Sequence, residues 1–260
     1  MKIPPPKIST RKVIPAVVDA SRNIIGNQSI EKCFVYAPDA LGEALFRDFV
    51  GEFGPVTTTA PVQVQLRSVF PPKTPVCYAS MFTGALPEAH GITKYEKPVL
   101  SCDTLFDALL RDGKKVAIIA VADCSVARIF LNRPLDYFIE EYDPQVNDRV
   151  LGLLTDGDYD FILAYNQGYD DAMHRTTPRS GEALDAMRKH LASFQELAGA
   201  FLNRFVGRNR LVLFAPDHGT HIDPQTGRGA HGLDIPDDIE VSSLWGIYDR
   251  DTRLPRKNTQ

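Results

Sequence analysis

The stretch RLVLFAPDHG (Arg210–Gly219) runs from an apolar segment directly into a proline, an aspartate and a histidine. Similar short apolar segments recur along the chain, and segments with helical periodicity separate them. The predicted strands are Cys33–Ala37, Val62–Phe70, Lys115–Val121, Tyr137–Glu141, Tyr159–Tyr165, Arg210–Ala215 and Ser243–Tyr248. This alternation is typical of β-α-β units, so the sequence predicts the α/β class, with a central, mostly parallel β-sheet and helices on both faces.

Five segments between these strands have the periodicity of amphipathic helices. They are Ala40–Val50, Pro75–Thr83, Cys102–Arg111, Gln145–Leu154 and Ser180–Val206. We expect Ser101 to act as the N-cap of the third of them. The two ends of the chain, Met1–Ser9 and Asp251–Gln260, are rich in proline and charge, and we expect them to be loosely held.

Composition narrows the class of protein before any motif is considered. The chain has 260 residues, of which 43% are hydrophobic and 24% charged, as in ordinary globular proteins. A net charge of −4 argues against a protein that binds nucleic-acid polymers through phosphate neutralisation. No segment approaches the roughly 20 apolar residues of a membrane span, and prolines interrupt the start of the chain. We therefore expect a cytoplasmic protein without membrane contact.

The four cysteines do not indicate a metal or redox motif. Cys33, Cys77, Cys102 and Cys124 form no C-x-x-C pair and are too few for a disulfide scaffold. We expect ordinary buried thiols.

Polar side chains that could bind a metal or act in catalysis follow four of the predicted strands. Because ligands of open α/β sheets bind outside the carboxyl ends of the strands, these side chains are expected at one edge of the sheet. They are Asp39 after the first strand, Thr74 after the second, Asp170 with His174 after the fifth, and Asp217 with His218 after the sixth. His231, in the loop GRGAHG, is a further candidate.

Each of these residues also has an ordinary structural interpretation. An aspartate after a strand is often a turn former, and Asp170 with His174 could be a local pair on one helical face. His218 and His231 could be a hydrogen-bonded core residue and a surface residue. Thr74 before Pro75 could be only a helix N-cap.

Convergence of three carboxylates favours a metal site over these alternatives. Buried unpaired charges cost several kcal/mol each, so a cation is the natural occupant. The mixed oxygen and nitrogen donors suit zinc, with manganese as the second choice. Three carboxylates and a threonine alkoxide would balance two divalent ions in charge. A metal also lowers the pKa of a bound hydroxyl, which would make Thr74 a nucleophile at the start of a helix that attracts phosphate.

Five segments together resemble the alkaline phosphatase superfamily, in particular its nucleotide pyrophosphatase/phosphodiesterase branch. They are PDALG (Pro38–Gly42), FPPKTPVCYASMFTGALPEAHGI (Phe70–Ile92), DDAMH (Asp170–His174), PDHG (Pro216–Gly219) and AHG (Ala230–Gly232). The resemblance implies an alkaline phosphatase-like core, and the short interval between His218 and His231 leaves no room for a large cap insertion. It also implies residues 1–28 as an N-terminal extension, residues 29–250 as a single catalytic domain and residues 251–260 as a flexible tail.

The resemblance implies a role for each matching residue. Asp39, Thr74, Asp217 and His218 match the positions that hold one zinc ion, and Asp170, His174 and His231 match those that hold the other. Thr74 matches the covalent nucleophile, which would form a phospho-threonine intermediate that water hydrolyses.

One position departs from the pattern of the diesterases. They usually present an asparagine to the phosphoryl oxygen after the HGI segment, whereas this chain reads HGITKYEKP. Lys94 or Tyr95 could take that role as a cation or a hydroxyl donor.

The sequence therefore predicts a metal-dependent hydrolase that cleaves phosphodiester or pyrophosphate bonds in a small phosphorylated substrate such as a nucleotide. One alternative is a phosphomonoesterase or a metal-dependent phosphomutase, which the missing asparagine and Lys94 favour. A second is a non-catalytic protein that binds metal or nucleotide. A homo-oligomer, in which another subunit covers the site, is also open.

Overall fold

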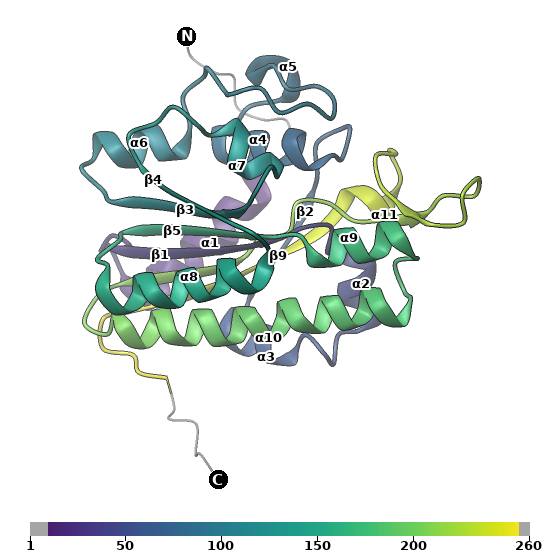
Figure 1. Cartoon of the computed structure of the whole chain (residues 1–260). Coiled ribbons are helices and arrows are strands. Elements are labelled where there is room, and N and C mark those ends of the chain that lie inside the picture. Colours follow the sequence, from purple (N-terminus) through teal and green to yellow (C-terminus); the bar gives the residue numbers. More distant parts are fainter. Residues whose placement is uncertain (1–9, 255–260) are drawn as a thin grey trace.

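The computed structural model describes residues 10–254 and consists of a seven-stranded sheet between two layers of helices (Figure 1). The strands of this sheet are β1 (Lys32–Pro38), β2 (Val62–Arg67), β3 (Val116–Val121), β4 (Asp136–Glu140), β5 (Phe161–Asn166), β6 (Arg210–Phe214) and β9 (Glu240–Tyr248). Their order is β2-β9-β6-β1-β5-β3-β4. β9 pairs antiparallel with both β2 and β6, and the other neighbouring strands pair parallel. The predicted α/β class and mostly parallel sheet are confirmed.

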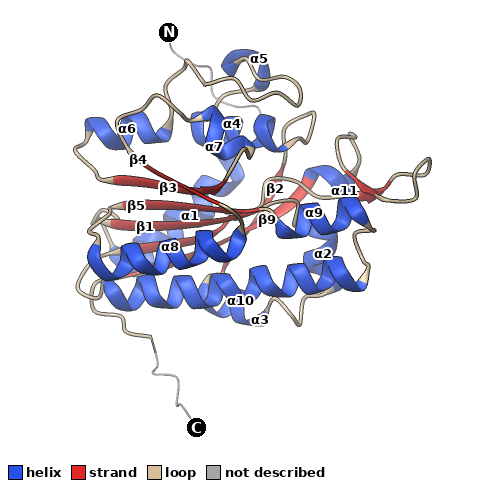
Figure 2. Cartoon of the chain, viewed as in Figure 1, coloured by secondary structure: helices blue, strands red, loops and turns tan. Residues whose placement is uncertain are grey.

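Helices cover both faces of the sheet, as Figure 2 shows. One layer contains α4 (Thr74–Thr83), α5 (Pro87–His90), α6 (Leu105–Arg111) and α7 (Ser125–Ile129). The other contains α8 (Asp143–Asp156), α10 (Gly181–Arg204) and α3 (Gly54–Thr59). The remaining helices are α1 (Thr10–Ile25), α2 (Glu43–Asp48), α9 (Gly168–Arg175) and α11 (Pro236–Ile239). None of the helices within residues 10–254 is long and apolar enough to cross a membrane.

The core lies between the sheet and these helical layers. Every residue of β3 and β5 is buried, which is the burial expected of central parallel strands covered on both faces. The long helix α10 buries one face, with Met187, Phe194 and Phe201 fully inaccessible to solvent. Its apolar stripe packs on β1 and β6. Burial of this stripe therefore stabilises the positions of the two strands that precede Asp39 and Asp217.

Helix α6 begins later than the predicted helix Cys102–Arg111. Ser101 is not its N-cap, because α6 begins at Leu105 and Thr104 takes that position. The Thr104 hydroxyl accepts the main-chain N–H of Asp107, whose carboxylate accepts the N–H of Thr104 in return. This reciprocal pair is a capping box, and it stabilises a helix start more strongly than a lone serine.

Parts of both predicted terminal segments contact the sheet. Within the predicted extension 1–28, helix α1 contacts β2 and β9, whereas Met1–Ser9 lies outside the described residues. Near the other end, Arg210 donates to the main-chain oxygens of Asp249 and Thr252. The first residues of the predicted tail are therefore attached to the sheet, and residues 255–260 are not described.

The topology brings three strand ends to one place. β6, β1 and β5 are parallel neighbours in the sheet, with Tyr36 beside Phe214 and Pro38 beside Asn166. Asp39, Asp170 and Asp217 follow these strands and so lie at the same edge. Between His218 and His231 the chain forms only the short hairpin β7 (His221–Ile222) and β8 (Gly229–Ala230), so no large insertion covers that edge.

Candidate active site

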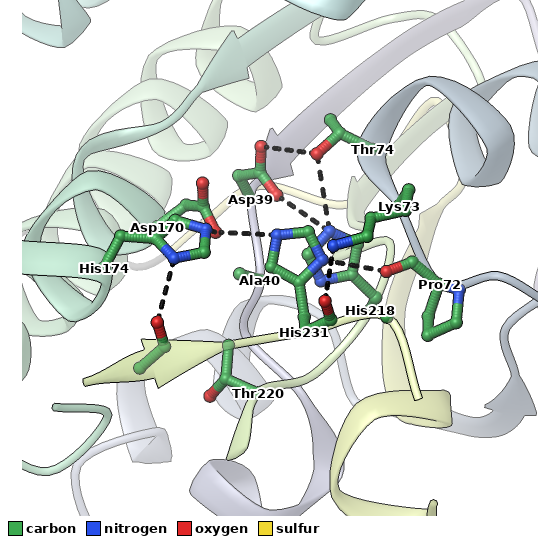
Figure 3. A network of polar contacts seen from close by, with 12 residues as sticks. Asp39, Ala40, Pro72, Lys73, Thr74, Asp170, His174, His218, Thr220 and His231 are labelled. Carbon is green, nitrogen blue, oxygen red and sulfur yellow. Dashed lines mark hydrogen bonds and ion pairs between the residues drawn. The ribbon is translucent and has the colours of Figure 1, made fainter. Parts of the chain in front are cut away.

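Helix α4 presents Thr74 at its first turn, at the carboxyl edge of the sheet (Figure 3). Lys73, not Thr74, occupies the N-cap position, and its side chain makes no capping hydrogen bond. The Thr74 hydroxyl oxygen lies 3.3 Å from Asp39 Oδ2 and 3.4 Å from His218 Nε2. Thr74 is only 4% exposed, so this hydroxyl is held among ionisable groups and away from bulk water. The interpretation of Thr74 as a simple N-cap is therefore wrong.

Two groups of three metal-ligand side chains form around this threonine. Asp39, Asp217 and His218 make the first group, which is fully buried, and Asp170, His174 and His231 make the second. Within each group the candidate ligand atoms all lie within 4.8 Å of one another. His218 and His231 stack with ring centroids 4.0 Å apart, so the two groups adjoin.

All three histidines point the same nitrogen away from these groups. The Nδ1 atoms of His174, His218 and His231 lie 2.9, 3.1 and 2.8 Å from the main-chain oxygens of Gly229, Gly219 and Pro72. Because a carbonyl oxygen only accepts, each Nδ1 carries the proton and each neutral ring has a lone pair on Nε2. This arrangement is how proteins orient metal-binding imidazoles.

The lone pairs on Nε2 face oxygens of the Asp39, Asp217 and Asp170 carboxyl groups. Nε2 of His218 lies 3.4 Å from Asp39 Oδ1 and 3.3 Å from Asp217 Oδ2. Nε2 of His174 and of His231 lie 3.3 and 3.6 Å from Asp170 Oδ1. These three carboxylate oxygens are buried and have no hydrogen-bond partner among the described residues. A cation in each group would satisfy all of them, so the residues present fit a two-metal site.

The ionisation of the first group reflects its burial. Burial and the nearby Asp217 and Asp170 charges raise the pKa of the Asp39 carboxyl well above its usual value. Tyr165 donates a hydrogen bond to Asp39 Oδ2, which opposes this rise and orients the carboxylate. Burial also raises the pKa of Asp217. A divalent ion would reverse this by stabilising the charged carboxylates.

The second group is more open than the first. The His174 side chain is 41% exposed and that of Asp170 is 16% exposed. The adjacent Asp170 carboxylate raises the pKa of His174, whereas burial and the neighbouring His218 lower the pKa of His231. Asp170 and His174 do form the local helical pair considered from the sequence, and His231 joins that pair from another part of the chain.

The first turn of α9 is held by groups that the sequence did not identify. The carboxylate of Asp143 accepts the main-chain N–H groups of Gln167 and Gly168, both at 2.9 Å. His190 Nε2 accepts the next one, from Tyr169, at 3.0 Å. These contacts fix the helix that carries Asp170 and His174. In the sequence, Asp143 was visible only as an acid before a predicted helix, and no motif marked His190 or Tyr165.

Lys94 and Tyr95 are not brought to these groups. Their side chains are 74% and 60% exposed. Lys94 pairs with Glu96, and Tyr95 lies beneath Lys97. Helix α5 ends at His90, and no hydrogen bond or ion pair among the described residues joins Lys94 or Tyr95 to the two ligand groups, so their role in substrate binding stays a prediction.

Residues 59–225 match the family described as type I phosphodiesterase / nucleotide pyrophosphatase. The chain belongs to this family. The resemblance read from the five motifs is thereby confirmed, and the family lies within the alkaline phosphatase superfamily. No curated protein sequence matches the chain.

Solved structures with the same fold include two of murine ectonucleotide pyrophosphatase / phosphodiesterase 5. One is an inactive threonine-to-alanine variant in complex with AMP, with a TM-score of 0.62 and 15% identity. The other has a TM-score of 0.58 and 17% identity. Both alignments cover 75% of this chain but only 59% of the murine protein, so this chain spans less than two thirds of the structures it matches.

Proposed function

We propose that the protein is a two-metal phosphoester hydrolase that cleaves phosphodiester or pyrophosphate bonds through a covalent intermediate on Thr74. The observation that carries this proposal is the position of the Thr74 hydroxyl between Asp39 and His218, beside three buried carboxylate oxygens without partners. Family membership supports the same class of reaction.

Asp39, Thr74, Asp217 and His218 would hold one ion, and Asp170, His174 and His231 the other. Mixed oxygen and nitrogen donors favour zinc over magnesium or calcium, with manganese as the second choice. When bound, such ions supply a Lewis acid that lowers the pKa of a hydroxyl and stabilises charge on phosphoryl oxygens.

The reaction at Thr74 has two balanced displacements. In the first, Thr74 Oγ1 loses its proton and attacks phosphorus, so that a Thr74 O–P bond forms while the bond to the leaving-group oxygen breaks. The leaving oxygen departs with the bonding electron pair and takes up a proton. In the second, water attacks the same phosphorus, the Thr74 O–P bond breaks, and Thr74 recovers a proton. Burial of Thr74 within α4 fixes the direction from which it attacks.

We propose a nucleotide as the substrate. The support is the murine relative whose structure contains AMP, together with the family that the sequence matches. In the first turn of α4, Pro75 has no main-chain N–H, and those of Val76 and Cys77 donate to the main-chain oxygen of Lys73. The N–H of Thr74 itself is therefore the donor that this turn offers to an anionic phosphoryl group.

The test is hydrolysis of a chromogenic phosphate diester and the matching monoester by zinc-loaded protein. We expect preference for the diester and loss of turnover in Thr74→Ala. Thr74→Ser is the matched control, because it retains a hydroxyl and should retain part of the activity. Undiminished turnover by Thr74→Ala would refute the role of Thr74.

The alternatives give other outcomes in the same assay. Preference for the monoester would indicate a phosphatase or mutase. Metal and nucleotide binding without turnover of any ester would indicate a non-catalytic binding protein.

A further inference from the structure

Asp238 is a fully buried carboxylate just outside the two ligand groups. It lies in α11, shortly after the loop that follows β8 and carries His231, and its exposed fraction is 0%. Its carboxylate has three hydrogen-bond donors. Oδ2 accepts the main-chain N–H groups of Gly232 and Leu233, both at 2.8 Å, and Oδ1 lies 2.8 Å from His221 Nδ1.

Two of these donors belong to the main chain directly after His231. Gly232 and Leu233 are the two residues immediately after His231, so the Asp238 carboxylate fixes the main chain on one side of that ligand. The peptide bond between His231 and Gly232 is also held at its other polar end, because Lys73 Nζ donates to the main-chain oxygen of His231 at 2.5 Å. The peptide bond that follows His231 is therefore fixed both at its N–H and at its oxygen.

The main chain of Asp238 reaches the other ligand group. Its carbonyl oxygen accepts the N–H of Gly219, the residue after His218, at 2.7 Å. The approach is close, because a Cβ on Gly219 would lie 2.0 Å from the main-chain oxygen of Asp237. A Cβ on Gly42, three residues after Asp39, would lie 2.4 Å from the Cα of Gly219. Three ligand-bearing segments thus pack at one point.

A buried carboxylate is costly unless its charge is compensated. Here two main-chain N–H groups and an imidazole N–H provide that compensation, and no other acidic side chain is hydrogen-bonded to it. Asp238 does not belong to either ligand group. The free-energy cost of burying the Asp238 carboxylate is explained if this carboxylate fixes the main-chain conformation of the loop that carries His231.

We infer that Asp238 is a positioning residue, whose carboxylate holds the loop that carries His231 and whose main-chain oxygen ties that loop to the segment that carries His218. The inference rests on the proposed two-metal function. It predicts a selective effect: loss of the side chain disturbs the group of Asp170, His174 and His231, while the hydrogen bond from Gly219 and the first group persist.

The experiment is a calorimetric titration of metal-free protein with zinc, paired with the visible spectrum of the cobalt-substituted protein. Asp238→Ala should retain wild-type affinity for one ion and lose about 10- to 100-fold for the other, the usual effect of removing a group that orients a ligand. Asp238→Asn should restore much of the loss, because its amide oxygen still accepts from Gly232 and Leu233. The matched control is Asp237→Ala, which removes the exposed neighbouring carboxylate and should change neither affinity.

A second pair of variants covers the case in which Asp238→Ala does not fold. His221→Ala removes one donor to Asp238 and should weaken only the same ion, whereas His221→Asn replaces the Nδ1–H with an amide N–H and should restore it. The role of Asp238 would be overturned if Asp238→Ala and His221→Ala both bound the two zinc ions with wild-type affinity. It would also be overturned if these substitutions weakened the binding of both ions equally. If the wild type bound no zinc, the two-metal proposal itself would fail.

Discussion

His231 Nδ1 lies 2.8 Å from the main-chain oxygen of Pro72, two residues before Thr74. The segment that delivers the nucleophile therefore also orients a ligand of the second group, and Lys73 repeats the connection through the main-chain oxygen of His231 (Figure 3). The segment that carries Thr74 and the loop that carries His231 are thus joined by direct hydrogen bonds.

This relationship predicts the effect of His231→Asn. The asparagine amide can still donate to Pro72, but it lacks the Nε2 atom that faces Asp170. We expect metal analysis of the variant to give one bound zinc per chain in place of two, with little change in the unfolding midpoint of the metal-free protein. Retention of two zinc ions would exclude His231 as a ligand.

Removal of Asp143 should act on the same group from a distance. Asp143→Ala leaves the main-chain N–H groups of Gln167 and Gly168 without their acceptor, which should lower the free energy of unfolding by about 1–3 kcal/mol. It should also weaken zinc binding by Asp170 and His174. Urea denaturation and zinc titration measure the two effects. Asp148→Ala, at an exposed position of the same helix α8, is the matched control, and the account fails if the two variants behave alike.

Zinc binding should strengthen as the pH rises. The folded metal-free protein keeps protons on Asp39 and Asp217 at pH values where the unfolded chain has lost them, because both pKa values are raised above 3.8. The metal-free protein therefore loses stability as the pH rises through that window, and zinc must displace these protons. The zinc-induced increase in Tm should be larger at about pH 7.5 than at about pH 5.5. An increase independent of pH would contradict the assignment of these carboxylates.

Close packing at Gly219 gives a prediction about stability. Gly219→Ala places a Cβ 2.0 Å from the main-chain oxygen of Asp237 and should destabilise the protein by about 1–3 kcal/mol or more. Gly199→Ala is the contrasting control, because this helix position has no neighbour within 4 Å of an added Cβ. That substitution should stabilise the protein by about 0.5–1 kcal/mol. Denaturant unfolding of both variants would show opposite signs, and equal midpoints would refute the packing argument.

The sheet could be predicted because short apolar segments alternate with segments of helical periodicity. All seven of its strands lie where the sequence predicted them, although β2 ends at Arg67, before the predicted Phe70. Helix α9 was not among the predicted helices, since it is short and begins with glycine, although the spacing of Asp170 and His174 suggested a helical pair. Asp143 and His190, which are distant in sequence, hold its first turn. Such tertiary support leaves no local pattern.

The seven ligand and nucleophile candidates could be found because each follows a strand or falls in a family motif. Their partners could not, since main-chain oxygens such as Pro72 and Gly229 have no signature in a sequence. Asp238 looked like one acid in the polar segment LDIPDD, and only the fold shows that it is buried. Lys94 was predicted from proximity to a motif, and the fold places it on the surface.

The central claim is that Thr74 becomes covalently attached to phosphorus. The most direct measurement is peptide mass mapping of zinc-loaded protein quenched in acid during turnover of a phosphate diester. The account predicts a phosphoryl adduct on the peptide that contains Thr74, and no adduct in Thr74→Ala. Turnover by the wild type with no adduct on that peptide, together with undiminished turnover by Thr74→Ala, would contradict it.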